Sequence, residues 1–75
     1  MIENDEETIK KKILIFFELK SLVHLKLKSE EFRNGRITKV LENHILLEER
    51  KLGLIPIFFN EIYHVDPMIL REGVE

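Results

Sequence analysis

The sequence predicts a mainly β protein, in which an N-terminal α-helix is followed by a five-stranded, strongly bent antiparallel sheet that forms a small open barrel. Two observations carry this prediction. Apolar residues recur at helical spacing up to about residue 20, and beyond it they alternate with polar residues in short runs between turns. With 75 residues, one domain is expected, with a helix at about 5–20, a barrel at about 21–67 and a C-terminal tail at 68–75.

Composition narrows the class of protein. Hydrophobic residues make up 44% of the chain and charged residues 35%, too apolar for a disordered chain and too charged for a membrane protein. There is no cysteine, which excludes disulfides and cysteine-based metal sites. Twelve Lys and Arg stand against fourteen Asp and Glu, which disfavours a general polyanion binder. The acidic start and the short apolar runs favour a cytoplasmic protein without a membrane partner.

The first expected element is the helix over about 5–20. Asn4 can cap it, and Glu7, three residues later, completes an arrangement like a capping box. The apolar residues that then share one helical face are Ile9, Ile13, Phe16 and Phe17. We expect this face to pack on the sheet. The alternatives are a free amphipathic helix that docks on a partner or a membrane surface, and a buried strand over 13–17.

Five strands are expected after Ser21, because the period of the apolar residues changes to two. An Asn-Gly pair, Asn34–Gly35, falls inside the second strand and usually marks a hairpin turn. The strand-like run that flanks it is long, so we interpret it as a sharp bend where glycine lets two backbones approach closely. The expected strands are 23–28, 32–41, 45–50, 54–58 and 62–65.

The stretch from Val23 to Pro67 resembles the Sm and Sm-like (LSm) domain family. Residues 23–27, 32–37 and 45–47 resemble the first Sm motif, including its glycine in the bent second strand, and 57–67 resemble the second motif. The resemblance implies a helix followed by a five-stranded bent barrel. It also implies a ring of five to seven subunits, in which the fourth strand of one subunit joins the fifth strand of the next.

The residues with which Sm proteins hold a uracil base are replaced here. In that family an Asp-x-x-x-Asn turn and an Arg-Gly loop enclose the base, whereas this chain has Leu41 and Ile45 in the turn and Phe58–Phe59 in the loop. The third strand is similar to that of the bacterial branch, the RNA chaperone Hfq, whose apolar residues directly follow the turn. The basic residue and the histidine of the Hfq loop are missing from Phe58–Asn60.

A loop altered in this way can still bind RNA by stacking. Two adjacent Phe residues in a tight loop cannot both point into one core, so at least one is expected to offer its ring to a base. Neighbouring amide and imidazole groups would add hydrogen bonds. The candidate RNA-binding residues are Asn43, His44, Phe58, Phe59 and Asn60. The alternative is that both rings are buried at a subunit interface or under the N-terminal helix.

These observations predict an Sm-like homo-oligomer that binds single-stranded RNA at the loop between the last two strands. The alternative is an interaction or scaffold subunit that has lost RNA binding and has a protein partner. The expected oligomer interface comprises Leu54, Ile55, Ile57, Ile62 and Val65. Pro56 complicates this interface, because its missing N–H weakens the joint if it faces the neighbour and leaves it intact if it faces the third strand.

The remaining patterns indicate surface or packing roles. His24, His44 and His64 are far apart on different expected strands, so we expect no metal site, and no other cofactor is implied. No Ser, His and acid set indicates catalysis, and no enzyme activity is expected. Glu30–Glu31 and Glu48–Glu49 are expected to be solvated at turns or edges. A basic strip is expected on the solvated face of the first two strands, from Lys26, Lys28, Arg36 and Lys39.

Overall fold

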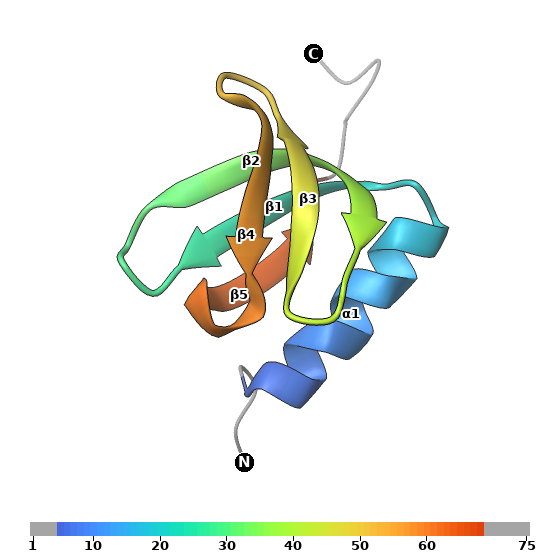
Figure 1. The fold of residues 1–75 in the computed structure, drawn as a ribbon, viewed down its shortest axis with the longest axis vertical. Helices are drawn as coiled ribbons and strands as arrows, with labels where there is room; N and C mark the ends of the chain where they lie inside the picture. The colour runs from blue at the N-terminus through green and yellow to red at the C-terminus, as the bar shows by residue number, and fades with distance from the viewer. Residues whose placement is uncertain (1–4, 69–75) are drawn as a thin grey trace, which may run out of the picture.

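The computed structural model describes residues 5–68, which form one α-helix and a five-stranded antiparallel sheet (Figure 1). The elements in chain order are α1 (Glu6–Glu18), β1 (Leu22–Leu27), β2 (Phe32–Val40), β3 (His44–Glu49), β4 (Gly53–Phe58), the 3-10 turn η1 (Phe59–Glu61) and β5 (Ile62–Pro67). The predicted fold class is confirmed, and the ends of the predicted elements agree with the observed ones within about two residues. Most of the expected tail, 69–75, lies outside the described residues.

The helix α1 begins one residue later than the sequence suggested. Its N-cap is Asp5, whose carboxylate accepts a hydrogen bond from the Thr8 N–H at 2.8 Å. The expected cap, Asn4, lies outside the described residues. Ile9 and Ile13 are buried, and the helix packs against β2, β5 and η1, as the expected apolar face requires. Within residues 5–68, no helix has the length and apolar character needed to cross a membrane.

Replacing Asp5 with alanine is expected to lower Tm at pH 7 by about 3–8 °C, because the Thr8 N–H loses its acceptor. The hydrogen bond from the Thr8 N–H lowers the pKa of Asp5 from its ordinary value of 3.8. This stabilisation is therefore present above pH 3.8 and is lost as the pH falls through the lowered value. Thermal unfolding followed by circular dichroism measures it. Asp5→Asn keeps an acceptor and is the control, and an unchanged Tm for Asp5→Ala at pH 7 would contradict the cap.

The sheet has the strand order β4-β3-β2-β1-β5, so β2 is central and β4 and β5 are the two edges. The first half of β2 pairs with β1 and the second half with β3. Gly35 belongs to both ladders, opposite Val23 on β1 and Glu49 on β3. At this point β2 arches from one half of the sheet to the other (Figure 1). The interpretation of Asn34–Gly35 as a bend within a strand is confirmed.

The bend at Gly35 exists because two backbones approach closely there. A Cβ atom at Gly35 would lie 2.1 Å from the carbonyl oxygen of Glu48 and 3.0 Å from the Cα of Glu49. Such a distance is far below van der Waals contact, so only glycine fits without moving β2 or β3. The glycine is required here for its missing side chain.

The core lies inside the bent sheet and is covered on one side by α1 (Figure 1). It is formed by two residues of α1, by Phe59 of η1 and by inward residues of the strands. The full set is Ile9, Ile13, Val23, Leu25, Leu27, Ile37, Ile45, Leu47, Ile57, Phe59, Ile62 and Val65. The barrel is open, because β4 and β5 are the two ends of the strand order. This is the layout that the resemblance to Sm domains implies, with both sheet edges unpaired within residues 5–68.

Candidate nucleic-acid interface

The pairing of β3 with β4 places the rings of His44 and Phe58 side by side. The two residues are directly opposite in the ladder, and their ring centroids are 4.9 Å apart with an angle of 34° between the planes. Phe58 is 42% exposed, although it is an apolar aromatic side chain. Because strand pairing fixes both backbones, the ring of Phe58 is held at the surface by the sheet itself.

The next residue, Phe59, points the opposite way. Its side chain is only 3% exposed and belongs to the core, and the Nζ atom of Lys10 on α1 lies 5.2 Å from its ring centroid. Its N–H donates a hydrogen bond to the carbonyl oxygen of Asn43 at 3.1 Å, which ties η1 to the turn between β2 and β3. One of the two rings is exposed, as expected, but Phe59 itself is unavailable to RNA. Including Phe59 among the RNA-binding residues was wrong, because it fills the core beneath α1.

The other candidate residues fall in two places. Asn43 is exposed in the turn directly before His44, so it lies beside the His44–Phe58 pair. Asn60 is exposed on η1 and lines a hollow of about 510 Å³ whose other walls come from the end of β1, the turn after it, the start of β2 and Glu61. The structure therefore groups Asn43, His44 and Phe58, and it places Asn60 in a hollow that contains none of these three.

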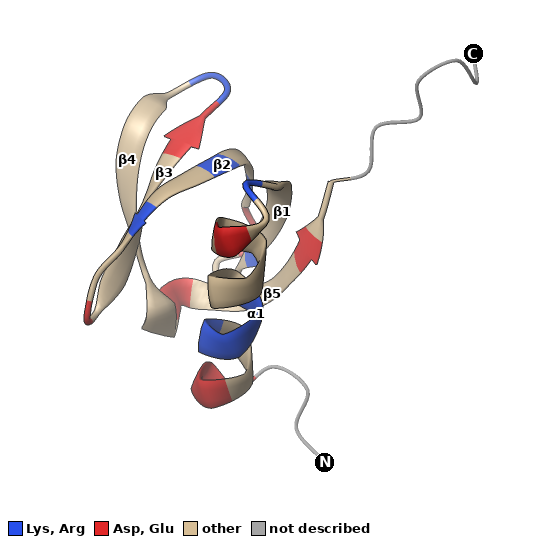
Figure 2. Cartoon of the chain, turned by 90° about the vertical axis from the view of Figure 1, so that its right-hand side faces the viewer, with Lys and Arg blue, Asp and Glu red and all other residues tan. Residues whose placement is uncertain are grey.

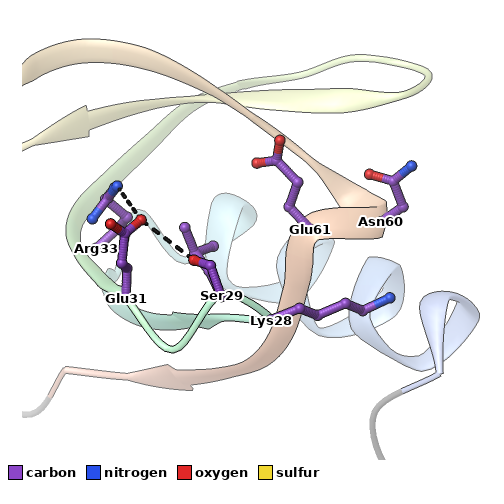
Figure 3. Close-up of a pocket in the computed structure, with 7 residues that line it drawn as sticks. Lys28, Ser29, Glu31, Arg33, Asn60 and Glu61 are labelled. Atoms are coloured by element: carbon purple, nitrogen blue, oxygen red, sulfur yellow. Dashed lines mark hydrogen bonds and ion pairs between the residues drawn. The ribbon is translucent and has the colours of Figure 1, made fainter.

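The hollow beside Asn60 is lined by the Glu31–Arg33 ion pair and by the charged residues Lys28 and Glu61. Asn60 and Glu61 extend from η1 on one side, across from Glu31 and Arg33 on the other (Figure 3). Arg33 Nη2 and Glu31 Oε1 are 3.0 Å apart, and the Ser29 hydroxyl donates to the same carboxylate oxygen at 3.3 Å. Since Arg33 is already paired with a carboxylate, it offers a phosphate less attraction than an unpaired arginine would.

The expected interface residues are mostly core residues. Ile57, Ile62 and Val65 are 2%, 0% and 1% exposed, so their side chains cannot line a surface between subunits. Leu54 is 62% exposed and Ile55 is partly buried. The prediction relied on apolar character alone. Ile57 faces the barrel interior on β4, and Ile62 and Val65 both face it on β5, where the register against β1 shifts between their partners Leu27 and Leu25. Their contribution to an interface is restricted to the backbone of the two edge strands.

A carboxylate that the sequence analysis placed in solvent is buried. Glu48 is exposed as expected, but Glu49 is 8% exposed and accepts hydrogen bonds from the N–H groups of Lys51 at 2.8 Å, Leu52 at 2.9 Å and Asn34 at 3.2 Å. The N–H groups of Leu52, Lys51 and Asn34, in that order, lower the pKa of Glu49. Counting by twos from Ile45 and Leu47 would have placed Glu49 on the buried face.

The three histidines occupy three separate environments. His24 hydrogen-bonds to Asn34 and stacks on Phe32, with ring centroids 4.9 Å apart. His64 Nε2 lies 3.0 Å from Asp66 Oδ2. His44 contacts Phe58, as described above. Among residues 5–68, no three His, Cys, Asp or Glu side chains gather closely enough to hold a metal ion.

Two of the four residues of the expected basic strip, Lys26 and Arg36, have acidic neighbours. Lys26 Nζ lies 3.7 Å from Glu30 Oε1 and within 5.3 Å of the Tyr63 ring centroid. Arg36 lies opposite Glu48 in the β2–β3 ladder. Basic and acidic segments are interspersed along the strands and the helix (Figure 2). Such a mixed distribution disfavours attraction of a polyanion without regard to its bases.

The arrangement that remains is an exposed aromatic ring supported by an imidazole and adjacent to an exposed amide. Such a group can stack on a nucleobase and hydrogen-bond to its edge, but it contributes little phosphate neutralisation. No protein-family model and no curated protein matches this sequence.

Proposed function

We propose that this chain is an Sm-like protein that self-associates and binds single-stranded RNA by stacking a base on Phe58. The observation that carries the proposal is the exposed Phe58 ring, 42% accessible and fixed opposite His44 by the β3–β4 ladder. Sequence-tolerant recognition of single strands relies on such rings, because every base has a π face. The site lies at the loops that read bases in the family that the chain resembles.

In this proposal the neighbours of Phe58 have distinct roles. His44 supports one side of the Phe58 ring, since their centroids are 4.9 Å apart, and the base stacks on the accessible side. The amide of Asn43 offers one acceptor and two donors to the edge of that base. Leu41 and Ile45 cannot supply the polar groups with which Sm proteins select uracil, so we expect little discrimination between U-rich and A-rich RNA.

Replacing Phe58 with alanine is expected to weaken binding of short U-rich and A-rich RNA by about 5- to 150-fold, because one stacked base contributes ~1–3 kcal/mol. Fluorescence anisotropy at low salt measures the affinity. Phe58→Tyr keeps the ring and should bind nearly as wild type. Phe32→Ala removes an equally exposed ring on β2 and controls for general loss of aromatic surface. No RNA binding by an intact wild-type oligomer would remove the proposal.

A scaffold subunit without RNA binding is the second candidate. The observation that favours it is a set of exposed apolar side chains on the two edge strands: Leu54, Phe58 and Tyr63. Apolar side chains on unpaired edge strands are available to a partner chain that adds to the sheet. In that case Phe58→Ala would leave RNA affinity unchanged and would reduce the recovery of a protein partner that co-purifies with the wild type.

A further inference from the structure

Each open edge of the sheet carries one of the two prolines of the chain. Pro56 lies in β4 and Pro67 at the end of β5. A proline has no N–H, so what it does in a strand depends on which side that position faces. In an antiparallel pair, hydrogen-bonded and non-hydrogen-bonded positions alternate, and the missing donor can be placed from the neighbouring bonds.

In β4 the missing donor faces the open edge. The Phe59 N–H bonds to Asn43 O at 3.1 Å, one step beyond the His44–Phe58 pair of the same ladder. Counting back by twos, Ile57 and Ile55 are bonded to β3, whereas Pro56, opposite Leu46, is at a non-bonded position. The N and C=O positions of Pro56 therefore point away from β3.

The neighbouring ladder supports this count. The Leu41 N–H bonds to His44 O at 2.8 Å, so the even-numbered residues of β3 direct their backbone groups toward β2 rather than toward β4. Leu46 is one of these residues, and its carbonyl oxygen also accepts a hydrogen bond from Thr38 Oγ1 at 3.2 Å. On β4, the backbone N–H and C=O groups of Leu54 and Phe58 also point toward the open edge. Pro56 lies between these two residues and is therefore the central position of this edge.

The same holds for the other edge. The Met68 N–H bonds to Leu22 O at 2.8 Å, one step beyond the Val23–Pro67 pair. Pro67 is therefore also at a non-bonded position, and its missing donor faces away from β1. The backbone N–H and C=O groups of Val65, two residues earlier, also point away from β1. Each open edge thus keeps its outward carbonyl groups and has lost one outward N–H to proline.

We infer that Pro56 and Pro67 keep strand pairing between copies of this chain weak and finite. The inference rests on the part of the proposed function by which copies pair through these edges, and it is independent of RNA binding. The occupant of each edge is a second copy, because β4 and β5 are the two free ends of one sheet and both offer outward carbonyls and donors. Pairing of two different edges is head-to-tail and can extend without limit unless it closes. Each edge lacks one N–H donor and has a proline ring in its place. Every pairing of two copies through these edges therefore loses backbone hydrogen bonds.

The test compares Pro56→Val, Pro67→Val and the double variant with the wild type by sedimentation velocity over a concentration series. Each restored N–H is expected to lower the association midpoint about two- to twelvefold, and the double variant should form larger particles. Leu54→Val is the matched control, since it adds a β-branched side chain at an outward position that already has an N–H. Circular dichroism verifies that each variant is folded. The two single variants test the two edges separately.

The outcomes separate this inference from the proposed self-association. A wild type that associates while both proline variants keep its midpoint overturns the inference and leaves self-association in place. A monomeric wild type with associating variants supports the inference and overturns wild-type self-association. Monomers throughout overturn both. An equal shift in Leu54→Val also overturns the inference, because β propensity rather than the donor would then explain the change.

Discussion

Gly35→Ala is expected to destabilise the folded chain by about 3 kcal/mol or more and to lower Tm by more than about 12 °C. The added Cβ atom would lie 2.1 Å from the carbonyl oxygen of Glu48, which is a backbone atom of β3 and cannot rotate away. Relief requires β2 and β3 to separate at the bend, where the hydrogen bonds of both ladders meet. Thermal and urea unfolding monitored by circular dichroism measure the loss.

Gly53 provides the matched control for this substitution. It is the first residue of β4 and has φ +85°, and no atom outside its chain neighbours lies within 4 Å of a Cβ built there. Asparagine tolerates positive φ, so Gly53→Asn is expected to change stability by less than about 1 kcal/mol. A Gly35→Ala variant as stable as Gly53→Asn would contradict the close approach of the two strands at the bend.

Glu49→Gln is expected to lower Tm at pH 7 by about 5–10 °C, because the amide replaces a carboxylate that accepts three backbone N–H groups. Two of these donors, Lys51 and Leu52, belong to the turn before β4, and the third, Asn34, belongs to β2. The variant therefore loosens the hairpin and its attachment to β2 together. The loss should be largest in hydrogen-exchange protection of these amides.

The effect of Glu49 depends on pH in a defined direction. The backbone N–H groups of Leu52, Lys51 and Asn34 lower its pKa in the folded chain from the ordinary value of 4.5. The stabilisation is fully present above pH 4.5 and is lost as the pH falls through the lowered value. The Tm difference between wild type and Glu49→Gln should thus be constant from pH 7 to about 5 and shrink below 4.5. Glu48→Gln, on the exposed face, should show neither effect.

The strand pattern could be read from the sequence because one side of each strand is buried. The alternation of Val23, Leu25 and Leu27 with His24 and Lys26 fixes which side chains enter the core. The bend at Asn34–Gly35 was also predictable, since the strand-like run continued past it. The first feature follows from the alternation of apolar and polar side chains along a strand, and the second from a glycine in the middle of a strand. Both are local properties of the sequence.

The sequence located the candidate site but did not determine which of its residues are exposed. Sequence placed Phe58 and Phe59 in one loop and required that one be exposed, but the choice between them depends on α1, which covers Phe59. Glu49 was missed because acidic residues near a turn are usually solvated. Its burial depends on three N–H groups that converge only when the hairpin folds onto β2.

By itself the sequence determined the class of fold, the order of its elements and the residue at which the central strand bends. These follow from short-range periodicity and from the steric size of glycine, which are properties of neighbouring residues. The direction in which Pro56 and Pro67 lack a donor, the exposure of Phe58 and the convergence of three N–H groups on Glu49 were decided only by the tertiary structure. Each of these features depends on which strands are neighbours in the sheet and on the register of their pairing. The pairing joins segments that are far apart in the sequence, so it cannot be read from the local pattern of one segment.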